Sequence, residues 1–181
     1  MQFDSTGAWT FDADADGFTY ADDTFNGTSN ADMAVGDYDP AGGFVGGGLK
    51  VYLGPGNTGG ATSGGWTKDI AAAENQTIRV SLRYRMLMGE GYESNEYGEV
   101  LLEIDGVRYG ADVNDSLVHF VGAGNGGGTD DTGWQFATFD VPLTAGINTM
   151  TVGAYNNRAT AGDEWVEVFI DEVSVTVIDA A

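Results

Sequence analysis

The chain has 181 residues, 29 of them glycine, no cysteine and a net charge of −21. This charge argues against a nucleic-acid partner, because phosphate contacts need clustered Lys and Arg. The absence of cysteine excludes disulfides and thiolate metal sites, and no apolar run approaches the roughly 18 residues of a membrane-spanning helix. No signal peptide is visible, since the N-terminus lacks a basic region followed by an apolar one. This length suits one domain, which we place over residues 1–181.

The pattern of apolar residues predicts an all-β fold. Short segments rich in Val, Ile, Thr, Phe and Tyr lie between clusters of Gly, Asn and Asp, and no long stretch keeps a helical period. Residues 26–48 are interpreted as a long loop. Strands are expected at residues 9–12, 48–54, 65–71, 76–88, 97–105, 116–120, 134–141, 147–155 and 164–178. Without an internal repeat or linker, they indicate one two-layer antiparallel β-sandwich, jelly-roll-like, with long Gly- and Asp-rich loops.

The acidic turn at residues 12–23 is the first candidate calcium site. It begins with the D-x-D-x-D-G pattern of an EF-hand loop, but an Asp takes the last position of the pattern, where a Glu is expected. No helical periodicity flanks it, so a true EF-hand is not expected. Asp at alternate positions with a Gly turn can still wrap Ca²⁺ on a β scaffold, and the alternative is a solvated acidic turn. The expected ligands are Asp12, Asp14, Asp16 and Asp23.

Residues 76–105 are predicted to form a long hairpin with an acidic tip. Apolar and polar side chains alternate at both ends of this segment, which indicates two half-buried strands. The polar parity of the first strand carries three arginines, and we expect Glu99 and Glu103 to pair with Arg85 and Arg83 across the hairpin. The alternative is that this arginine face binds carboxylates or sulfates of an acidic polysaccharide.

Two local signals predict details of the backbone. The Asp105–Gly106 pair between β residues suits a type I′ hairpin turn. The apolar parity of residues 164–178 shifts partway, which predicts a β-bulge at Asp171–Glu172 that turns Asp171 towards a cation. If residues 107–121 behave as one broken strand, three polar loops gather at one end of the sandwich: 89–96, 122–131 and 156–163.

The remaining carboxylates are also grouped in turns. This grouping favours bound divalent cations over a surface that is acidic only for solubility or for a salty medium. With one His and no Cys, Ca²⁺ is favoured over transition metals, and His119 is interpreted as a packed or exposed strand residue. Beyond the acidic turn, the candidate metal ligands are Glu93, Glu96, Glu99, Asp130, Asp131, Asn156, Asn157, Asp163, Glu164 and Asp171.

Aromatic residues beside the polar loops indicate a ligand site. Flat rings near amides, carboxylates and arginine bind sugars by stacking on the ring and by hydrogen bonds to its hydroxyls. Trp165 and Phe169 have the parity opposite to the apolar residues of their strand and are expected to face outward. The structural alternative is that Trp134 and Trp165 cover the ends of the core. The candidate ligand contacts are Tyr92, Tyr97, Asn125, Trp134, Tyr155, Arg158 and Trp165.

Catalysis has little support in the sequence. No GxSxG, HExxH or Ser/His/Asp order is present. The EID at residues 103–105 is similar to the active-site strand of jelly-roll glucanases, but the further Glu is missing. The segment 152–158 is similar to the YNQ strand of jelly-roll alginate lyases, whose other motifs are absent. We therefore expect no enzyme, with a lyase or glycoside hydrolase acting on acidic marine polysaccharide as the alternative.

Four segments together resemble a known type of module: ADADGFTYADDTFNGTS (13–29), GYESNEYGEVLLEIDG (91–106), GNGGGTDDTGWQ (124–135) and VGAYNNRATAGDEWVEVFIDEV (152–173). The resemblance is to β-sandwich ligand-binding domains of large secreted calcium-dependent adhesins and cell-surface proteins of marine bacteria. Those domains are similar in turn to carbohydrate-binding modules. The resemblance implies an extracellular location, bound Ca²⁺ and recognition of a glycan or of a protein C-terminus, in which Ca²⁺ can hold the ligand's carboxylate.

The expected function is therefore a non-catalytic, Ca²⁺-dependent ligand-binding domain of a bacterial adhesin or surface protein. Its partner would be a glycan or a peptide C-terminus on another cell surface, and the domain would be monomeric within a larger chain. A purely structural spacer of an adhesin is a further alternative, although this chain has unusually long loops for a spacer.

Overall fold

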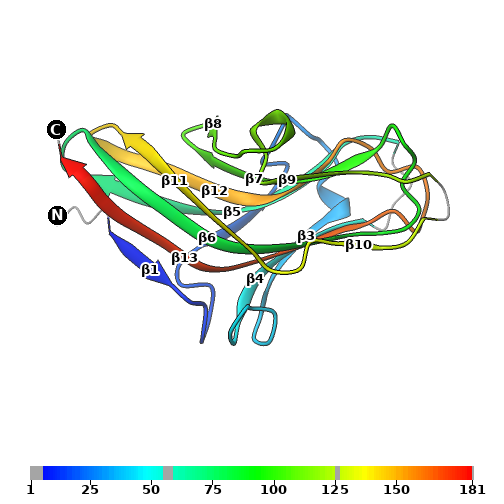
Figure 1. Ribbon diagram of the computed structural model, residues 1–181, viewed down its shortest axis with the longest axis horizontal. Coiled ribbons are helices and arrows are strands. Elements are labelled where there is room, and N and C mark those ends of the chain that lie inside the picture. The colour runs from blue at the N-terminus through cyan, green and yellow to red at the C-terminus, as the bar shows by residue number, and fades with distance from the viewer. Residues whose placement is uncertain (1–5, 55–58, 125–126, 181) are drawn as a thin grey trace.

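The computed structural model describes residues 6–54, 59–124 and 127–180. Two antiparallel sheets pack face to face, which confirms the all-β sandwich (Figure 1). Sheet A contains β1 (Gly7–Trp9), β3 (Ala34–Asp39), β4 (Gly48–Leu53), β6 (Gln76–Met88), β10 (Asp130–Asp131), β11 (Gln135–Leu143) and β13 (Val166–Ala180). Sheet B contains β2 (Thr19–Asp22), β5 (Thr62–Ala72), β7 (Tyr97–Ile104), β8 (Val107–Arg108), β9 (Val118–Val121) and β12 (Gly146–Asn156).

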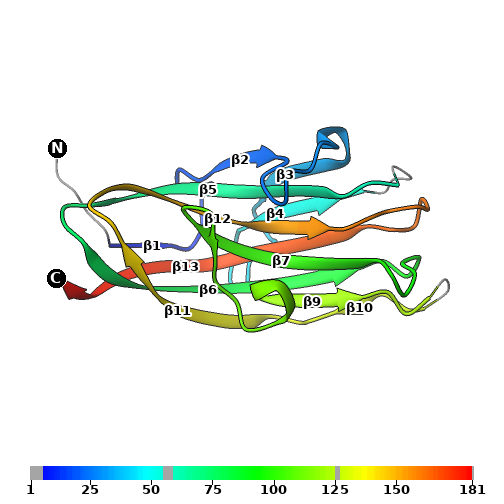
Figure 2. The same cartoon turned by 90° about the horizontal axis from the view of Figure 1, so that it is seen from above.

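Helical structure in the described part of the chain is limited to two short 3₁₀ turns, η1 (Ala31–Met33) and η2 (Val113–Asp115). Neither described turn has the length or apolarity that a membrane-crossing helix requires. The strands of both sheets run along the long axis of the molecule, as Figure 2 shows. The first strand β1 and the C-terminal end of β13 therefore lie at one end, and the loops after β6 and β12 lie at the other (Figures 1 and 2).

The core lies between the two sheets, where alternate side chains of the long strands point inward. On β6 the buried side chains have the predicted parity: Ile78, Val80, Leu82, Tyr84, Met86 and Met88. Sheet B contributes Val100, Leu102, Ile104, Met150, Val152 and Ala154. Because side chains alternate across a strand, the arginines of β6 lie on the outer face of sheet A, the face turned away from sheet B.

The predicted hairpin over residues 76–105 is wrong. β6 pairs with β11 and β13 in sheet A, whereas β7 pairs with β12 and β9 in sheet B. The connection 89–96 therefore crosses from one sheet to the other. Alternation determines which side chains of a strand face the core, but it does not determine which strand lies beside it, so two consecutive alternating segments were paired incorrectly.

The predicted ion pairs across that hairpin are wrong for the same reason. Arg83 pairs with Glu172 of β13, with 2.5 Å between Nε and Oε2. Arg85 makes a two-pronged ion pair with Asp131 of β10, at 2.9 Å and 2.5 Å. Glu103 instead accepts a hydrogen bond from Arg108 Nε at 2.9 Å. Each acid thus pairs with the arginine that its own sheet places beside it.

Two backbone predictions are confirmed. Asp105 and Gly106 have φ of 51° and 78° between the paired Ile104 and Val107, as a type I′ turn requires. The register of β13 against β6 shifts between Asp171 and Ser174, at the predicted bulge. The long loop predicted over 26–48 is wrong in part, because it contains η1 and β3. The sequence AVGDYD of β3 has a low β propensity from Gly and Asp, and its pairing with β4 overrides that propensity.

Candidate functional site

Three polar loops meet at the end of the sandwich away from β1, as the sequence predicted (Figure 1). The amide of Gly122 donates to the carbonyl of Glu96 at 2.9 Å, and the amide of Gly124 donates to the carbonyl of Tyr92 at 3.2 Å. These bonds join the loop after β9 to the connection 89–96. We call this region the loop end.

The connection 89–96 also packs closely against the loop between β12 and β13. A Cβ atom on Gly89 would lie 2.5 Å from the carbonyl oxygen of Asp163, and one on Gly91 would lie 2.4 Å from its Oδ1. Only glycine permits such an approach. Asn157 bridges the two loops, because its Oδ1 accepts from the amide of Tyr97 at 2.7 Å and its Nδ2 donates to the carbonyl of Asn95 at 3.0 Å.

This packing brings Glu93, Glu96 and Glu164 together. One carboxylate oxygen of each lies within 4.8 Å of the others, and among the described residues this glutamate cluster is the only group of three acidic, His or Cys side chains so arranged. Glu96 is 1% exposed and Glu164 is fully buried, while Glu93 is partly exposed. The cluster therefore has two carboxylates inside the protein and one at its surface.

Thr160 lies among all three carboxylates. Its hydroxyl oxygen is 3.2 Å from Glu93 Oε2, 3.2 Å from Glu96 Oε1 and 3.3 Å from Glu164 Oε1. A threonine hydroxyl has a single proton to donate, so it can satisfy only one of these three acceptors at a time. Its backbone amide donates to the second oxygen of Glu164. Three carboxyl oxygens thus surround one point that a single neutral hydroxyl serves.

The positive charge near the cluster is small. Arg158 Nε lies 3.7 Å from Glu96 Oε1, beyond hydrogen-bond distance, and its side chain is 47% exposed. Burial raises the pKa of the Glu96 carboxyl, and the neighbouring Glu93 and the charge of Glu164 raise it further, against hydrogen bonds from the Glu93 amide and the Thr160 hydroxyl. Buried carboxylates without a matching cation are unfavourable, because they have lost water and repel one another.

A bound cation would remove this repulsion. The donors are all oxygens, which suits hard ions such as Ca²⁺ and Mg²⁺ rather than transition metals. The cluster is poorly suited to glycoside hydrolysis, in which two carboxylates must flank the scissile bond. With Glu96 and Glu164 buried, a sugar chain has no access between them.

The predicted ligands of the 12–23 turn accept hydrogen bonds from their own surroundings. Asp14 Oδ1 accepts from the amide of Asp16 at 2.7 Å, and Asp16 Oδ2 accepts from the amide of Phe11 at 3.0 Å. Asp12 accepts a hydrogen bond from the Thr10 hydroxyl at 2.8 Å, and Asp23 accepts one from the backbone amide of Asn30 at 3.0 Å. These carboxylates shape the turn, and the structure does not bring three of them to one point.

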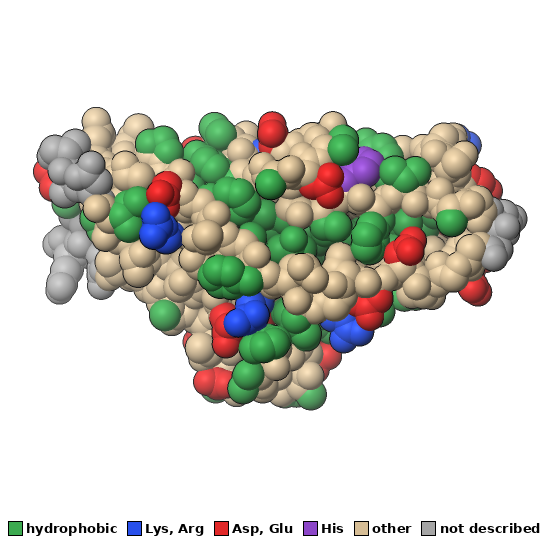
Figure 3. All heavy atoms as spheres, viewed as in Figure 1, with side chains coloured by type: hydrophobic (Ala, Val, Ile, Leu, Met, Phe, Trp, Pro, Cys, Tyr) green, Lys and Arg blue, Asp and Glu red, His purple; other side chains and the backbone are tan. Residues whose placement is uncertain are grey.

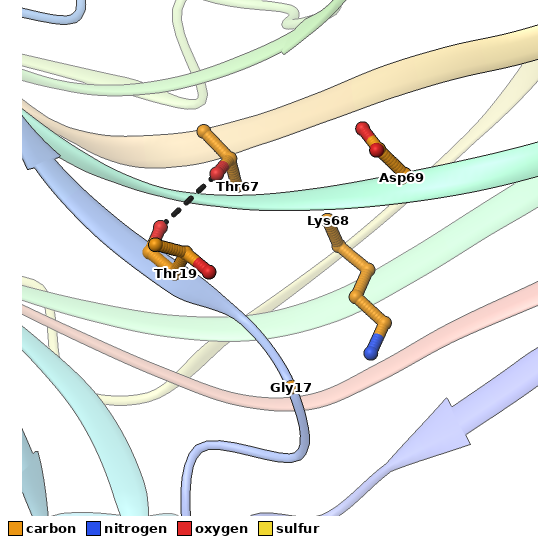
Figure 4. Close-up of a pocket in the computed structure, with 5 residues that line it drawn as sticks. All are labelled: Gly17, Thr19, Thr67, Lys68 and Asp69. Atoms are coloured by element: carbon orange, nitrogen blue, oxygen red, sulfur yellow. Dashed lines mark hydrogen bonds between the residues drawn. The ribbon is translucent and has the colours of Figure 1, made fainter.

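The hollow beside this turn is drawn in Figure 4. It has a volume of about 320 Å³ and is lined by Gly17, Thr19, Thr67, Lys68 and Asp69. Figure 4 shows the Lys68 side chain extending away from Asp69 towards Gly17. There its ammonium donates to the carbonyl of Asp16 at 2.6 Å and lies 5.3 Å from the Trp9 ring centroid. The Lys68 ammonium therefore stabilises the 12–23 turn by its bond to the Asp16 carbonyl.

Other predicted metal ligands also have partners elsewhere. Asp130 and Asp131 form β10, and the ion pair with Arg85 holds the pKa of Asp131 below its usual range. Glu99 Oε1 accepts from the side chains of Asn114 and His119, each at 2.7 Å, on the outer face of sheet B. His119 is accordingly packed, in agreement with its interpretation as a strand residue.

Asp171 is fully buried, but the bulge turns it to backbone amides. Its Oδ2 accepts from the amides of Phe44 and Val45 at 2.8 and 3.2 Å, and its Oδ1 accepts from the amide of Glu172 at 2.6 Å. Burial raises its pKa despite these bonds. Asp171 thus anchors the loop after β3.

Asn156 and Asp163 lie at the loop end without joining the cluster. Asn156 Oδ1 accepts from the amide of Thr62 at 2.9 Å, and its Nδ2 donates to the hydroxyl of Tyr92 at 3.0 Å. Asp163 is exposed beside Gly91. Together with Asn157, Asn156 forms the frame that supports the cluster.

The predicted ligand contacts are spread over several places. Tyr92 is 1% exposed and Tyr155 is 7% exposed, so neither presents a ring face to a ligand. Tyr97 packs against the His119 ring, with the ring centroids 4.5 Å apart and the planes tilted by 33°. Of the candidate contacts that the structure describes, Arg158 is the one that lies within ion-pair distance of the glutamate cluster. Asn125 lies outside the described residues.

The two tryptophans among the candidate ligand contacts, Trp134 and Trp165, lie on the outer face of sheet A. Trp165 stacks on Tyr52 at 6.2 Å, and Trp134 meets Phe44 edge-to-face at 5.9 Å. The outward orientation of Trp165 and Phe169 is confirmed, because the residues of opposite parity on β13 are fully buried. Sequence reasoning missed Thr160 as a member of the site, and no spacing in the sequence marks it.

Comparisons with protein-family models and with curated proteins give no match. Among solved structures, the chain is similar to a family 35 carbohydrate-binding module from Clostridium thermocellum, with 15% identity over 97% of this chain and 100% of that chain and a TM-score of 0.45. It is similar to the CBM35 from Cellvibrio japonicus Abf62, with 23% identity over 98% and 99% of the two chains and a TM-score of 0.43. A third similar structure, TmCBM61 in complex with β-1,4-galactotriose, has 14% identity over 90% and 89% and a TM-score of 0.44. At identities and TM-scores this low, no residue role passes from these proteins to this chain.

Proposed function

We propose that this chain is a non-catalytic, Ca²⁺-dependent ligand-binding domain of an extracellular bacterial surface protein or adhesin, with a glycan as its ligand. The observation that carries the proposal is the position of Thr160. Its one hydroxyl proton serves carboxylates of Glu93, Glu96 and Glu164, two of which are buried. An ion at this point would neutralise charges that the described protein groups leave unbalanced.

Calcium is the ion that best suits this site. Ca²⁺ takes six to eight oxygens in flexible geometry, and three carboxylates supply between three and six of them. An extracellular location fits this choice, because calcium is abundant there. Since the chain has no disulfide, a bound ion would also supply stability that disulfides give to other secreted domains. Because Glu93 is partly exposed, an ion held by the cluster would be accessible from solvent, and oxygens of a ligand would complete its coordination.

A second ligand class is favoured by Arg158. Its half-exposed guanidinium beside the cluster would add positive charge next to the ion, which suits a carboxylate such as a peptide C-terminus. A glycan array and a library of free-acid peptides, each read with Ca²⁺ and with EDTA, separate the two ligands. Amidated copies of any binding peptide are the control for the carboxylate.

The test of the ion itself is thermal unfolding with EDTA and with excess Ca²⁺. At a concentration about a hundredfold above Kd, binding contributes about 2.7 kcal/mol to the free energy of unfolding. For a chain of this size that corresponds to a rise in Tm of about 5–10 °C. Equal melting temperatures in EDTA and Ca²⁺ would refute the calcium part of the proposal, and calcium-stabilised protein that binds no ligand would favour a structural spacer.

A further inference from the structure

The outer face of sheet A carries exposed aromatic side chains next to one another. Phe136 is 57% exposed and Phe44 is 43% exposed. The guanidinium carbon of Arg83 lies between them, 4.0 Å from the centroid of the Phe44 ring and 5.6 Å from that of Phe136. Trp134 extends the row by its edge-to-face contact with Phe44. We call these four residues, Trp134, Phe44, Arg83 and Phe136, the aromatic strip.

The strip is held rigidly by elements from three parts of the chain. Phe136 of β11 stands directly opposite Arg83 of β6 in the sheet register. Phe44 belongs to the loop between β3 and β4, whose amides are fixed by the buried carboxylate of Asp171. This loop and the 10–17 turn protrude below sheet A in Figure 1, and Figure 3 shows hydrophobic and basic side chains where the protrusion meets the body. A preformed platform of this kind loses little entropy when a ligand binds.

A hollow lies on each side of the strip. One, of about 340 Å³, is lined by Trp9, Ser81, Phe136 and Ser174 among others. The other, of about 200 Å³, is lined by Asp39, Arg85, Trp134 and Phe169 among others. Each therefore combines aromatic walls with hydroxyl or charged groups. Ser81 and Arg85 are four residues apart on β6, about 13 Å along a strand, so the two hollows suit an elongated ligand.

The charges of this face are balanced within the protein. Each of the three β6 arginines pairs with a carboxylate of the same sheet: Arg79 with Asp140, Arg83 with Glu172 and Arg85 with Asp131. No net positive charge remains on these pairs for an anionic polymer, and the chain as a whole carries −21. The balanced pairs nevertheless keep hydrogen-bonding capacity that uncharged hydroxyls can use.

We propose that the aromatic strip and its two hollows form a second binding site, which takes an uncharged polysaccharide along β6. Sugar rings would stack on Phe136 and on the part of the Phe44 ring that Arg83 leaves uncovered, with the partly exposed Trp134 beside them, and their hydroxyls would bond to the polar groups of the hollows. The site shares no residue with the glutamate cluster, so its binding requires no calcium. It thus goes beyond the proposed function of the loop end, and either site can fail without the other.

The test is affinity electrophoresis of the whole chain in native gels that contain β-1,4-galactan, β-1,4-mannan, arabinoxylan or dextran, with EDTA throughout. Alginate serves as the anionic comparison. The variants are Phe136→Ala, Phe44→Ala and the ring-preserving Phe136→Tyr. The matched control is Ile147→Ala on β12 of sheet B, since Ile147 is 58% exposed. Circular dichroism and Tm confirm that each variant is folded.

The expected result is retardation of the wild type by at least one uncharged polysaccharide in EDTA. Phe136→Ala and Phe44→Ala should each weaken that binding about tenfold, the loss that removal of one stacked ring produces. Phe136→Tyr and Ile147→Ala should bind as the wild type. Retardation by none of the uncharged polymers, by alginate alone, or equally in the alanine variants would overturn the proposal.

Discussion

On the outer face of sheet A, each arginine of β6 meets one carboxylate from a neighbouring strand or bulge, at 2.5 to 2.9 Å. At the loop end, three carboxylates surround one threonine hydroxyl, and a single arginine lies 3.7 Å from one of them, Glu96. The side chains of the sheet A pairs are also 29–50% exposed to water, whereas Glu96 and Glu164 are buried. Both regions thus contain carboxylates and arginine. Their charges are matched one to one on sheet A, whereas carboxylates are in excess at the loop end.

This difference separates two roles for an acidic residue. A carboxylate that pairs with an arginine of its own sheet needs no bound ion to balance its charge. When that carboxylate is removed, the arginine that remains is exposed and is solvated by water. A buried carboxylate among others of like charge needs a cation or a proton, and it responds to both. The loop end should therefore be sensitive to calcium and to pH. The arginine pairs of sheet A should be insensitive to calcium and should respond to pH only in acidic solution, where their carboxylates become protonated.

The largest expected effect comes from Glu164→Gln. The amide keeps the size and one acceptor oxygen of the side chain but removes a buried charge. With excess Ca²⁺ the variant should lose most of the roughly 2.7 kcal/mol that ion binding contributes. In EDTA it should melt at or above the wild-type temperature, because the repulsion within the cluster is relieved. Thermal unfolding of both proteins in both buffers measures this crossover.

Glu90→Gln provides the matched control for that experiment. Glu90 is exposed in the same connection and stands outside the cluster. Its replacement removes one charge without removing a proposed ligand, so its calcium response should remain close to that of the wild type. A Glu164→Gln variant that calcium stabilises as strongly as the wild type would exclude the cluster as the ion site.

A smaller effect is expected from pH in EDTA. Burial raises the pKa of Glu96 above its unfolded value, so its contribution to stability is full below that value and is lost as pH rises through the folded pKa. Tm in EDTA should therefore fall as pH rises above the ordinary titration range of a glutamate. The raised pKa values of Asp171 and Glu167 act in the same direction, whereas the lowered values of Asp131 and Asp140 act only in more acidic solution.

Glu96→Gln isolates the part of this pH dependence that comes from the glutamate cluster. This variant should show a shallower fall of Tm with pH in EDTA, since Asp171 and Glu167 still titrate. Saturating Ca²⁺ should flatten or reverse the wild-type slope, because the ion competes with protons for the same oxygens. An identical slope in wild type and variant would show that the proton responsible is held elsewhere.

The smallest effect is expected from the arginine–carboxylate pairs on the outer face of sheet A. Asp131→Asn breaks the ion pair with Arg85, whose two side chains are 36% and 37% exposed. Such surface pairs contribute about 0.2–1 kcal/mol, so Tm should fall by only a few degrees at most. The loss should be the same in EDTA and in Ca²⁺. A calcium-dependent loss measured by thermal unfolding would mean that Asp131 takes part in ion binding.

Much of the fold was predictable from the sequence. The alternation of β6 predicted which side chains are buried, and Asp105–Gly106 and the parity shift near Asp171 predicted the turn and the bulge. The partner of each strand was not predictable, because alternation is the same whether β7 pairs with β6 or crosses to the other sheet. The arginine pairs were misassigned as a direct consequence.

The candidate site was predictable only as a region. Loops rich in Gly and acids were expected to gather at one end, and they do. Which acids converge depends on the close backbone contacts that Gly89 and Gly91 allow, and no sequence spacing encodes those contacts. Thr160 was missed because a lone threonine in a polar loop carries no ligand pattern. Most of the other candidate carboxylates accept hydrogen bonds from backbone amides, which is the commoner role of an acidic residue in a turn.

The crossing of the 89–96 connection between the sheets has a consequence for folding kinetics. β6 pairs only with strands far along the chain, so the sandwich depends on distant contacts, which is typical of slow folding. Glu93 and Glu96 lie on the crossing and Glu164 lies just before β13, so the three carboxylates converge only after both sheets have come together. An ion held there would stabilise the native state more than the folding transition state. Calcium would then slow unfolding while leaving the refolding rate nearly unchanged, and so lengthen the lifetime of the folded domain.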